Sequence, residues 1–219
     1  MLNIQTLTVG DLTANCYLVS DGDECIIIDP GDDADFITET ITNQKLKPTA
    51  IILTHGHFDH VLGCLELKLN FNLPIYLHKN DEKLYTSANQ SALHWLKKKT
   101  LKVPPLDHFI KAGDEVKVGN EILKVIETPG HTPGSICLYR GPTSVQRTDL
   151  SPPILLTGAT LFAQGVGRTD FSYSSPLQLT KSLDRLSKFP GNTIVYPGHG
   201  DLFFLQDFVG QSEDLKSLE

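Results

Sequence analysis

Hydrophobic and polar positions along the first half of the chain alternate as in short strands and then recur as in helices. The turn sequences Gly10-Asp11 and Asp21-Gly22-Asp23 separate the first three strands, as hairpins require. After Asp29-Pro30-Gly31, apolar side chains recur at helical spacing. The pattern predicts strands over 2–9, 15–19, 24–28, 50–54 and 74–77, and helices over 33–44, 61–71 and 79–99.

The second half repeats this order, with strands followed by a helix. Ser175, Pro176 and Gln178 predict a helix start, because Ser caps well, Pro suits the first turn and Gln follows three residues after the cap. Residues 140–153 combine Gly, Pro, Ser and charges and predict a surface excursion between strands. Strands are predicted over 109–110, 115–118, 121–127, 135–139, 154–156 and 194–196.

This order favours an α+β fold in which two sheets pack face to face with helices outside. A chain of 219 residues with 40% hydrophobic residues can bury a sizeable core. No stretch resembles a linker, so residues 1–219 are predicted to form a single domain, with 201–219 as a divergent C-terminal tail.

Charge and targeting signals narrow the classes of partner. The net charge of −7 and the lack of a long basic run argue against nucleic acid and anionic membranes as partners. No apolar stretch has the roughly 18 residues that a membrane span needs. The N-terminus lacks the features of a signal peptide, so we expect a cytoplasmic protein. The four cysteines form no CxxC pair and are expected to be free, buried thiols.

One polar cluster follows the apolar run that ends at Thr54. His55, His57, Asp59 and His60 fall within six residues. Buried polar groups need partners, and imidazole and carboxylate are ligands that zinc and iron accept. If the segment is extended, His55, His57 and Asp59 project together and His60 turns aside. This alternation predicts two sets of ligands, and hence two metals that share one loop.

Further marked residues follow other predicted strands. Asp29 ends the third strand, and His131 and His199 lie in turns rich in Pro and Gly. Taken alone, such a histidine is more often a turn or core residue than a ligand, and such an aspartate more often caps a helix. Together with the cluster, however, the two histidines complete a set of six candidate ligands. His78, His94 and His108 lack this setting and are expected to be structural.

The pattern His55-x-His57-x-Asp59-His60, followed by His131 and His199 with Asp29 upstream, resembles the metallo-β-lactamase superfamily. The sequences TPGHTPGS (128–135) and GRTD (167–170) resemble its glyoxalase II-like hydrolases, within them the short bacterial type. The resemblance implies a four-layer αβ/βα sandwich with metals at one edge between the sheets. It assigns the first metal to His55, His57 and His131, and the second to Asp59, His60 and His199.

The resemblance also implies roles around the metals. Asp29 would be a carboxylate behind the ligands that orients their loop. Arg168 and Asp170 would shape the rim of the site, through a structural ion pair or through substrate contact. Ala159 occupies the position where family members carry an Asp that bridges the metals, and a methyl group ligates nothing. We expect this change, introduced or natural, to weaken the second site more than the first, and we favour an introduced one.

The implied activity is hydrolysis of an acyl thioester, S-acylglutathione-like, or of a related ester. A bound metal lowers the pKa of its water toward ~7, and Asp59 would hold the resulting hydroxide as a catalytic residue. One or two Zn²⁺ ions are expected, with Fe or Mn as alternatives. Glutathione is left open as the thiol, because the sequence after His199 does not resemble the family's usual ending. A mononuclear iron persulfide dioxygenase and a non-catalytic metal-binding or interaction protein are the alternatives, and the oligomeric state is left open.

Overall fold

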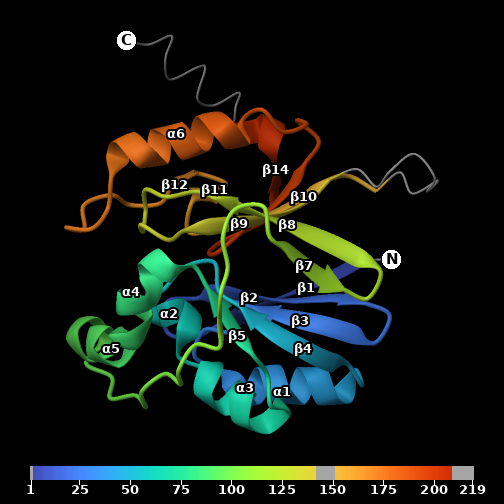
Figure 1. Cartoon of the computed structure of the whole chain (residues 1–219), viewed down its shortest axis with the longest axis vertical. Coiled ribbons are helices and arrows are strands. Elements are labelled where there is room, and N and C mark those ends of the chain that lie inside the picture. Colours follow the sequence, from blue (N-terminus) through green and yellow to red (C-terminus); the bar gives the residue numbers. More distant parts are fainter. Residues whose placement is uncertain (1, 142–150, 209–219) are drawn as a thin grey trace.

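Two six-stranded sheets pack face to face, with helices on both outer surfaces (Figure 1). The structure is a computed structural model that describes residues 2–141 and 151–208. The arrangement confirms the predicted α+β sandwich of two sheets with helices outside. The strands of the first sheet lie in chain order: β1 (Leu2–Val9), β2 (Ala14–Asp21), β3 (Glu24–Ile28), β4 (Lys47–Ile52), β5 (Ile75–Leu77) and β6 (His108–Phe109).

The second sheet has β10 beside both β9 and β13. Strands β10 and β13 run parallel, whereas the other pairs in this sheet are antiparallel. Its order across the sheet is β14 (Phe203–Phe204), β13 (Ile194–Pro197), β10 (Ile154–Gly158), β9 (Ile136–Arg140), β8 (Glu121–Glu127) and β7 (Glu115–Val118). A separate short hairpin joins β11 (Leu161–Phe162) to β12 (Gly165–Val166).

The burial of strand β3 on both faces explains why its sequence is a continuous apolar run. Ile26 and Ile28 belong to the core between the two sheets, while Ile27 belongs to the core beneath the helices. A strand buried on both faces needs apolar side chains at every position. Helices α1 (Ala34–Asn43) and α3 (Cys64–Phe71) cover the outer face of this sheet (Figure 1).

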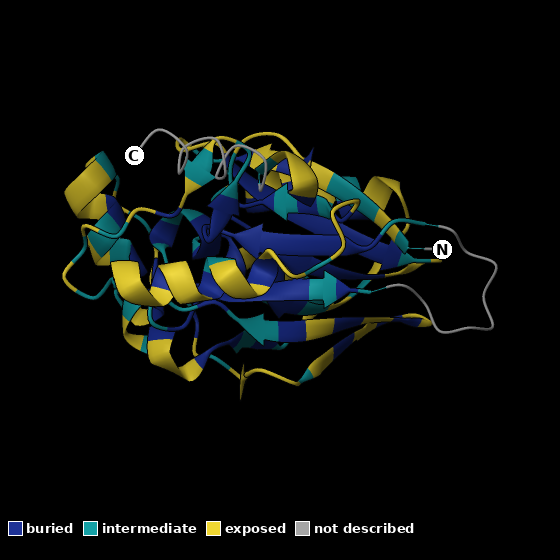
Figure 2. Ribbon diagram, turned by 90° about the horizontal axis from the view of Figure 1, so that it is seen from above, coloured by how far each residue is buried: buried dark blue, intermediate teal, exposed yellow. Residues whose placement is uncertain are grey.

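Helix α6 (Pro176–Leu186) covers the outer face of the second sheet. Its start is confirmed, because the Ser175 hydroxyl accepts a hydrogen bond from Gln178 N and Pro176 stands in the first turn. Leu179 and Leu186 are buried, whereas the outer face of the helix is exposed (Figure 2). The amphipathic pattern of the sequence therefore sets which side of the helix meets the sheet.

Two predicted helices are divided in the structure. The helix predicted over 61–71 consists of α2 (Phe58–Val61) and α3, separated at Gly63, whose nitrogen donates to the Gly31 carbonyl. The helix predicted over 79–99 consists of a 3-10 turn η1 (Lys79–Asp81), α4 (Glu82–Thr86) and α5 (Ala88–Leu96). Periodicity alone did not indicate these breaks, and the one at Gly63 involves a bond to a distant part of the chain.

Strand bounds also differ from those predicted. The strand predicted over 50–54 spans Lys47–Ile52, so Thr54 already lies in the loop that follows. Strands β11, β12 and β14 were not predicted, and each has only two residues. Strand β14 lies in the predicted tail and pairs with β13, so this part of the tail extends the second sheet. Residues 142–150 of the predicted excursion lie outside the described residues.

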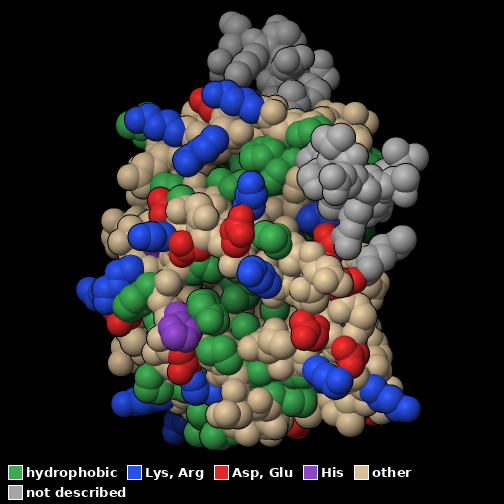
Figure 3. Space-filling view, turned by 45° about the vertical axis from the view of Figure 1, so that its right-hand side comes forward, with side chains coloured by type: hydrophobic (Ala, Val, Ile, Leu, Met, Phe, Trp, Pro, Cys, Tyr) green, Lys and Arg blue, Asp and Glu red, His purple; other side chains and the backbone are tan. Residues whose placement is uncertain are grey.

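The distribution of charged side chains on the surface and the state of the cysteines agree with what the sequence predicts. Basic and acidic side chains are interspersed over the face shown in Figure 3. Within residues 2–141 and 151–208, no helix is long and apolar enough to cross a membrane. All four cysteines are buried and free, as predicted.

Candidate metal centre

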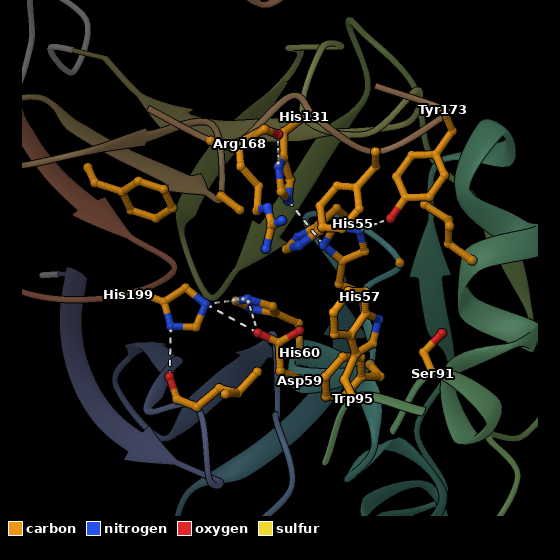
Figure 4. A pocket seen from close by; sticks show the side chains of 18 of the residues that line it. His55, His57, Asp59, His60, Ser91, Trp95, His131, Arg168, Tyr173 and His199 are labelled. Atoms are coloured by element: carbon orange, nitrogen blue, oxygen red, sulfur yellow. Dashed lines mark hydrogen bonds and ion pairs between the residues drawn. The ribbon is translucent and has the colours of Figure 1, made fainter. Parts of the chain in front are cut away.

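The six predicted ligands lie together at one end of the sandwich (Figure 4). Both sheets contribute, since the ligands between His55 and His60 follow β4, while His131 follows β8 and His199 follows β13. These histidines are up to 144 residues apart in the sequence. They come together only because the two sheets pack against each other.

The first set of ligand atoms comes from His55, His57 and His131. Nε2 of His131 lies 3.0 Å from Nδ1 of His57. Each of the three residues offers one ligand atom, and these atoms lie within 4.8 Å of one another. This is the set that the family resemblance assigned to the first metal.

The second set comes from Asp59, His60 and His199. The Nε2 atoms of His60 and His199 lie 3.2 Å apart. Oδ2 of Asp59 lies 3.5 Å from the first of these nitrogens and 3.3 Å from the second. Two imidazoles and one carboxylate thus point at a single position, as the resemblance implied for the second metal.

Hydrogen bonds behind two of the histidines fix which ring nitrogen is free. Nδ1 of His131 lies 2.9 Å from the Arg168 carbonyl, and Nδ1 of His199 lies 3.1 Å from the Leu12 carbonyl. A carbonyl only accepts, so both Nδ1 atoms donate to these carbonyls, and the Nε2 atom of each ring faces the site.

Asp29 fixes a third histidine through Thr54. Oδ1 of Asp29 accepts a hydrogen bond from Thr54 N at 2.7 Å, and Oδ2 accepts one from Thr54 Oγ1 at 2.6 Å. Because Thr54 has only one hydroxyl proton, its oxygen accepts from Nδ1 of His55, 3.0 Å away. Oδ2 of Asp29 also lies 3.3 Å from Nδ1 of His60. Asp29 therefore lies behind the ligands and orients their loop, in agreement with its predicted role.

The ring nitrogens that face the site are suited to bind metal ions. Nε2 of His55 is buried and has no hydrogen-bond partner among the described residues. The Nε2 atoms of His60 and His199 face each other; Nδ1 of His199 is bonded to the Leu12 carbonyl, and Nδ1 of His60 lies 3.3 Å from Oδ2 of Asp29. A buried lone pair without a partner is unfavourable, and a cation in each position removes that penalty. Imidazole and carboxylate donors suit zinc, iron and manganese.

The protonation states agree with this fit. Burial, and then the neighbouring His60, hold the pKa of His55 well below its ordinary value. Burial lowers the pKa of His57 to about 3 and also lowers the pKa of His131. These rings are therefore neutral at pH 7, which is the form that binds a metal.

The second set holds opposite charges. Burial by itself would raise the pKa of Asp59, but His60 and the hydrogen bond from His199 outweigh it and hold that pKa well below the usual range. Burial would lower the pKa of His60, but Asp59 and Asp29 outweigh it and raise that pKa. The carboxylate of Asp59 and the imidazole of His60 therefore stabilise each other's charged forms.

The alternation predicted along the ligand loop is wrong for Asp59. Helix α2 begins at Phe58, so the segment is extended only up to His57. In the helical part, Asp59 and His60 are neighbours that both face His199. The change from extended to helical backbone, rather than alternation along a strand, divides the six ligands into two sets.

The remaining histidines lie outside the cluster. Nδ1 of His78 accepts a hydrogen bond from Asn80 N, and its Nε2 lies 3.1 Å from Glu127. His94 and His108 are exposed to solvent. None of these three belongs to a ligand set among the described residues, in agreement with the structural role predicted for them.

Asp81 joins the two ligand loops and was missed by the sequence analysis. Its carboxylate is buried and accepts hydrogen bonds from Gly56 N (2.9 Å), Thr132 Oγ1 (2.6 Å) and Gly134 N (2.7 Å). Gly56 stands between two ligands, and Thr132 follows His131. Burial raises the pKa of Asp81. One aspartate at the start of a helix gave no local signal of this role.

Tyr173 was also missed. Its hydroxyl lies 2.8 Å from Nε2 of His57, on the side of the ring away from His131 (Figure 4). With Nδ1 of His57 in the first ligand set, Nε2 carries the proton and donates it to the Tyr173 oxygen. The phenol thus orients the fourth imidazole in the way that carbonyls orient His131 and His199.

Strand β2 holds the loop that carries His199. The Asn15 side chain donates to the Pro197 carbonyl at 3.0 Å and to the Gly200 carbonyl at 2.8 Å. The Tyr17 hydroxyl donates to the same Pro197 carbonyl at 2.5 Å. Since β2 belongs to the first sheet, these bonds attach the His199 loop to the sheet that carries the other ligands of its set.

Ala159 lies where the resemblance expects a metal-bridging carboxylate. It directly follows β10 and lines the same cavity as the two ligand sets. Its side chain is buried at 7% exposure and supplies no ligand atom. The two metal positions therefore share no anionic group from this residue.

Arg168 and Asp170 form a two-pronged ion pair at the rim. Nε and Nη2 of Arg168 lie 2.7 and 2.6 Å from the two oxygens of Asp170. The guanidinium also lies over the ring of Phe171, 4.5 Å from its centroid. The predicted pair is present, and its contacts within the chain favour the structural role over free substrate contact.

The ligands lie in a cavity of about 680 Å³. Its walls come from both halves of the chain and are mostly apolar, with Trp95 of α5 on one side (Figure 4). This volume lies within the range of about 300–1,000 Å³ that is usual for small-molecule sites. The arrangement thus places a set of metal-binding groups within reach of a small organic substrate.

Comparisons with known proteins agree with the fold and the site. The model of the metallo-beta-lactamase superfamily matches residues 9–199. The probable metallo-hydrolase YqgX of Bacillus subtilis is 34% identical over 195 residues, which cover 89% of this chain and 88% of the relative. The hydroxyacylglutathione hydrolase GloC of Haemophilus influenzae is 29% identical over 208 residues, 91% of each chain. The crystal structure of TTHA1623 in a di-iron-bound form has 33% identity and a TM-score of 0.82, covering 94% of this chain and 96% of that one.

The chain belongs to the metallo-β-lactamase superfamily. Its relatives and its clusters of histidine and aspartate place it among the probable metallo-hydrolases of that superfamily. The identity of the metal is not fixed by these ligands, because imidazole and carboxylate accept several divalent ions.

Proposed function

We propose that this protein hydrolyses an acyl thioester, or a related ester, at the two-metal centre. The observation that carries the proposal is the convergence of two sets of candidate ligand atoms in the lining of a substrate-sized cavity. The similarity to a protein named hydroxyacylglutathione hydrolase supports thioesters as the first class to test. Zinc is the first metal to test, followed by iron and manganese.

When bound, the metals lower the pKa of a coordinated water to about 7 and supply positive charge for the oxyanion that develops. The residues of the chain supply orientation. Asp59 is ionised, because His60 and His199 hold its pKa low, so it accepts a hydrogen bond from the attacking water. Its Oδ2 faces the cavity between these two histidines, which directs the water toward a carbonyl held above the centre.

The leaving group needs little help from the protein. In hydrolysis, the acyl carbon gains a bond to the water oxygen and loses its bond to sulphur, and the protons of the water end on the acid and the thiol. A thiol has a pKa of about 8.5, so a thiolate leaves without a strong general acid. Of the chain's side chains, this reaction requires only Asp59 to act on the attacking water; the other ligands hold the metals.

We propose that Ala159 weakens the second metal position and so impairs the reaction. The test compares this chain with the Ala159→Asp variant for metal content per chain and for hydrolysis of S-lactoylglutathione and other thioesters, esters and lactones. The variant is expected to hold more of the second metal and to turn over a thioester much faster. Equal metal content and equal activity would refute the role of Ala159.

The same panel tests the proposed activity itself. If the Ala159→Asp variant, loaded with zinc, iron or manganese in turn, hydrolyses no thioester, ester or lactone, the hydrolase proposal fails. Oxygen uptake with glutathione persulfide by the iron-loaded variant would instead indicate a persulfide dioxygenase.

A further inference from the structure

The walls of the cavity differ in chemistry from its floor. Besides the six ligands, the cavity is lined mostly by apolar side chains from both halves of the chain, together with the polar side chains of Ser91, Arg168 and Tyr173. The wall residues are Leu12, Leu84, Trp95, Phe162, Val166 and Phe171. They come from segments between Leu12 and Phe171, so both halves of the chain supply apolar surroundings for the groups attached to a reacting carbonyl.

The mouth of the cavity is also apolar. Leu12 keeps 41% of its surface exposed, and Trp95 keeps 59%. Large apolar side chains that stay exposed around a cavity often mark a binding surface. At the mouth these side chains would contact the outer part of a bound substrate. A charged group there would lie against apolar side chains instead of water.

The described lining of the cavity offers little to a carboxylate. Arg168 is the one lysine or arginine among the lining residues that the structure describes. Its guanidinium is paired with both oxygens of Asp170 and lies over the ring of Phe171, so a substrate carboxylate would have to compete with Asp170 for it. A carboxylate placed between these walls, away from the metal positions, would lose its hydration without an unpaired lysine or arginine beside it in the described lining, which is unfavourable.

We infer that the site selects substrates whose acyl and leaving groups are both apolar and uncharged, with Trp95 and Phe162 as the residues that determine specificity. This inference rests on the proposed hydrolase function and specifies its substrate class. S-acylglutathiones, whose thiol part carries two carboxylates, are then poorer substrates than neutral thioesters with the same acyl group.

The kinetic test uses matched pairs of thioesters on the Ala159→Asp variant. Each pair joins the same acyl group, from acetyl to hexanoyl, to glutathione or to the uncharged N-acetylcysteamine. We expect the neutral member to have at least a tenfold higher kcat/KM, and kcat/KM to rise about three- to fourfold per added methylene. A tenfold preference for glutathione, or a flat dependence on acyl length, would overturn the inference while leaving the hydrolase function in place.

Variants locate the specificity in the wall. Phe162→Ala and Trp95→Ala are expected to flatten the dependence on acyl length, because each removes apolar contact area. Leu69→Ala is the matched control, since Leu69 is 74% exposed on α3 and does not line the cavity.

Asp170→Ala releases the guanidinium of Arg168 and is expected to raise kcat/KM for glutathione thioesters relative to their neutral partners. Unchanged ratios in all three wall and rim variants would contradict the assignment.

A binding measurement separates specificity from catalysis. Trp95 is the single tryptophan of the chain, so its fluorescence reports occupancy of the cavity. The metal-loaded chain with Ala159 is titrated with S-(2-oxoheptyl) derivatives of N-acetylcysteamine and of glutathione, in which a methylene between sulphur and carbonyl prevents hydrolysis. Tighter binding of the neutral compound supports the inference, and equal or tighter binding of the glutathione compound overturns it. If no thioester is hydrolysed in the kinetic test, the hydrolase function fails and this titration still decides the specificity.

Discussion

At the scale of single residues, the site is determined by hydrogen bonds made on the far side of each imidazole. The carbonyls of Arg168 and Leu12 and the hydroxyls of Thr54 and Tyr173 each bond to one ring nitrogen, and the carboxylate of Asp29 lies in ion-pair distance of Nδ1 of His60. The other nitrogen of every ring is thereby directed into the cluster. Such outer partners commonly change metal affinity by about 10–100-fold when they are removed.

The neutral histidines predict how the metal-free protein responds to acid. His57 has a pKa of about 3 in the folded chain, against about 6.5 when unfolded, so the unfolded state binds more protons between these values. Stability therefore falls as the pH drops below about 6.5, by up to about 1.4 kcal/mol per pH unit for this residue. The lowered pKa values of His55 and His131 act in the same direction, whereas the raised pKa of His60 opposes them.

Urea unfolding in the presence of a chelator, at pH 5, 6 and 7, measures this slope. His57→Gln is expected to reduce it, and His94→Gln, at an exposed position on α5, is the matched control. A free energy of unfolding that is flat from pH 7 to pH 5, or a slope unaffected by His57→Gln, would show that these imidazoles are not held neutral by burial.

Residue types and spacing were sufficient to single out the six candidate ligands, which the fold brings together, because the signal lies in a dense local pattern and in histidines that follow strands. The roles of Asp81 and Tyr173 could not be predicted in this way. Each is a common residue in an ordinary local sequence, and each acquires its role only through contact with a loop far away in the chain.

At the scale of elements, Asp81 at the start of α4 connects the loop after β4 to the loop after β8. Asp81→Asn places an amide NH₂ against groups that already donate, so we expect a loss of about 1–3 kcal/mol in the free energy of unfolding. Metal affinity should fall with it, because both loops of the first ligand set lose their common anchor. Thermal unfolding and metal titration measure the two effects.

Asp107→Asn is the control for this variant. Asp107 accepts a hydrogen bond from Ile75 N and pairs with Lys68, and it does not line the cavity. Its loss is expected to lower stability without changing metal affinity. If both variants lower metal affinity equally, the effect of Asp81 is general destabilisation rather than anchoring of the ligand loops.

Element types were predicted well where the pattern was long, as for α6 with its Ser175 cap and for the strands around the doubly buried β3. The failures are short or interrupted elements. The start of α2 at Phe58 changed the grouping of Asp59, and two-residue strands such as β14 contain too few positions to show alternation.

At the scale of the whole molecule, metal binding should lock the two sheets together. The first ligand set takes His131 from the second sheet, and the second set takes His199 from it, while all other ligands follow β4. A metal that binds only the folded chain stabilises it by about 2.7 kcal/mol at a hundredfold excess over its dissociation constant. That corresponds to a rise of roughly 5–11 °C in Tm for a chain of this size.

Thermal unfolding, measured once with zinc and once with a chelator, gives this shift in Tm. The variant that combines His131→Ala with His199→Ala is the matched control, because it keeps the local cluster of the ligand loop but removes both contributions from the second sheet. The account expects the shift to disappear in this variant. A shift that survives would place the metal on the loop alone.

The central claim is that the two ligand sets hold metal ions, and anomalous scattering from crystals grown in zinc tests it most directly. The account predicts a peak among His55, His57 and His131, together with a second peak among Asp59, His60 and His199 that is weaker in this chain than in the Ala159→Asp variant. Crystals saturated with zinc, and then with iron and manganese in turn, that show no peak at either position, or peaks only elsewhere on the molecule, would contradict it.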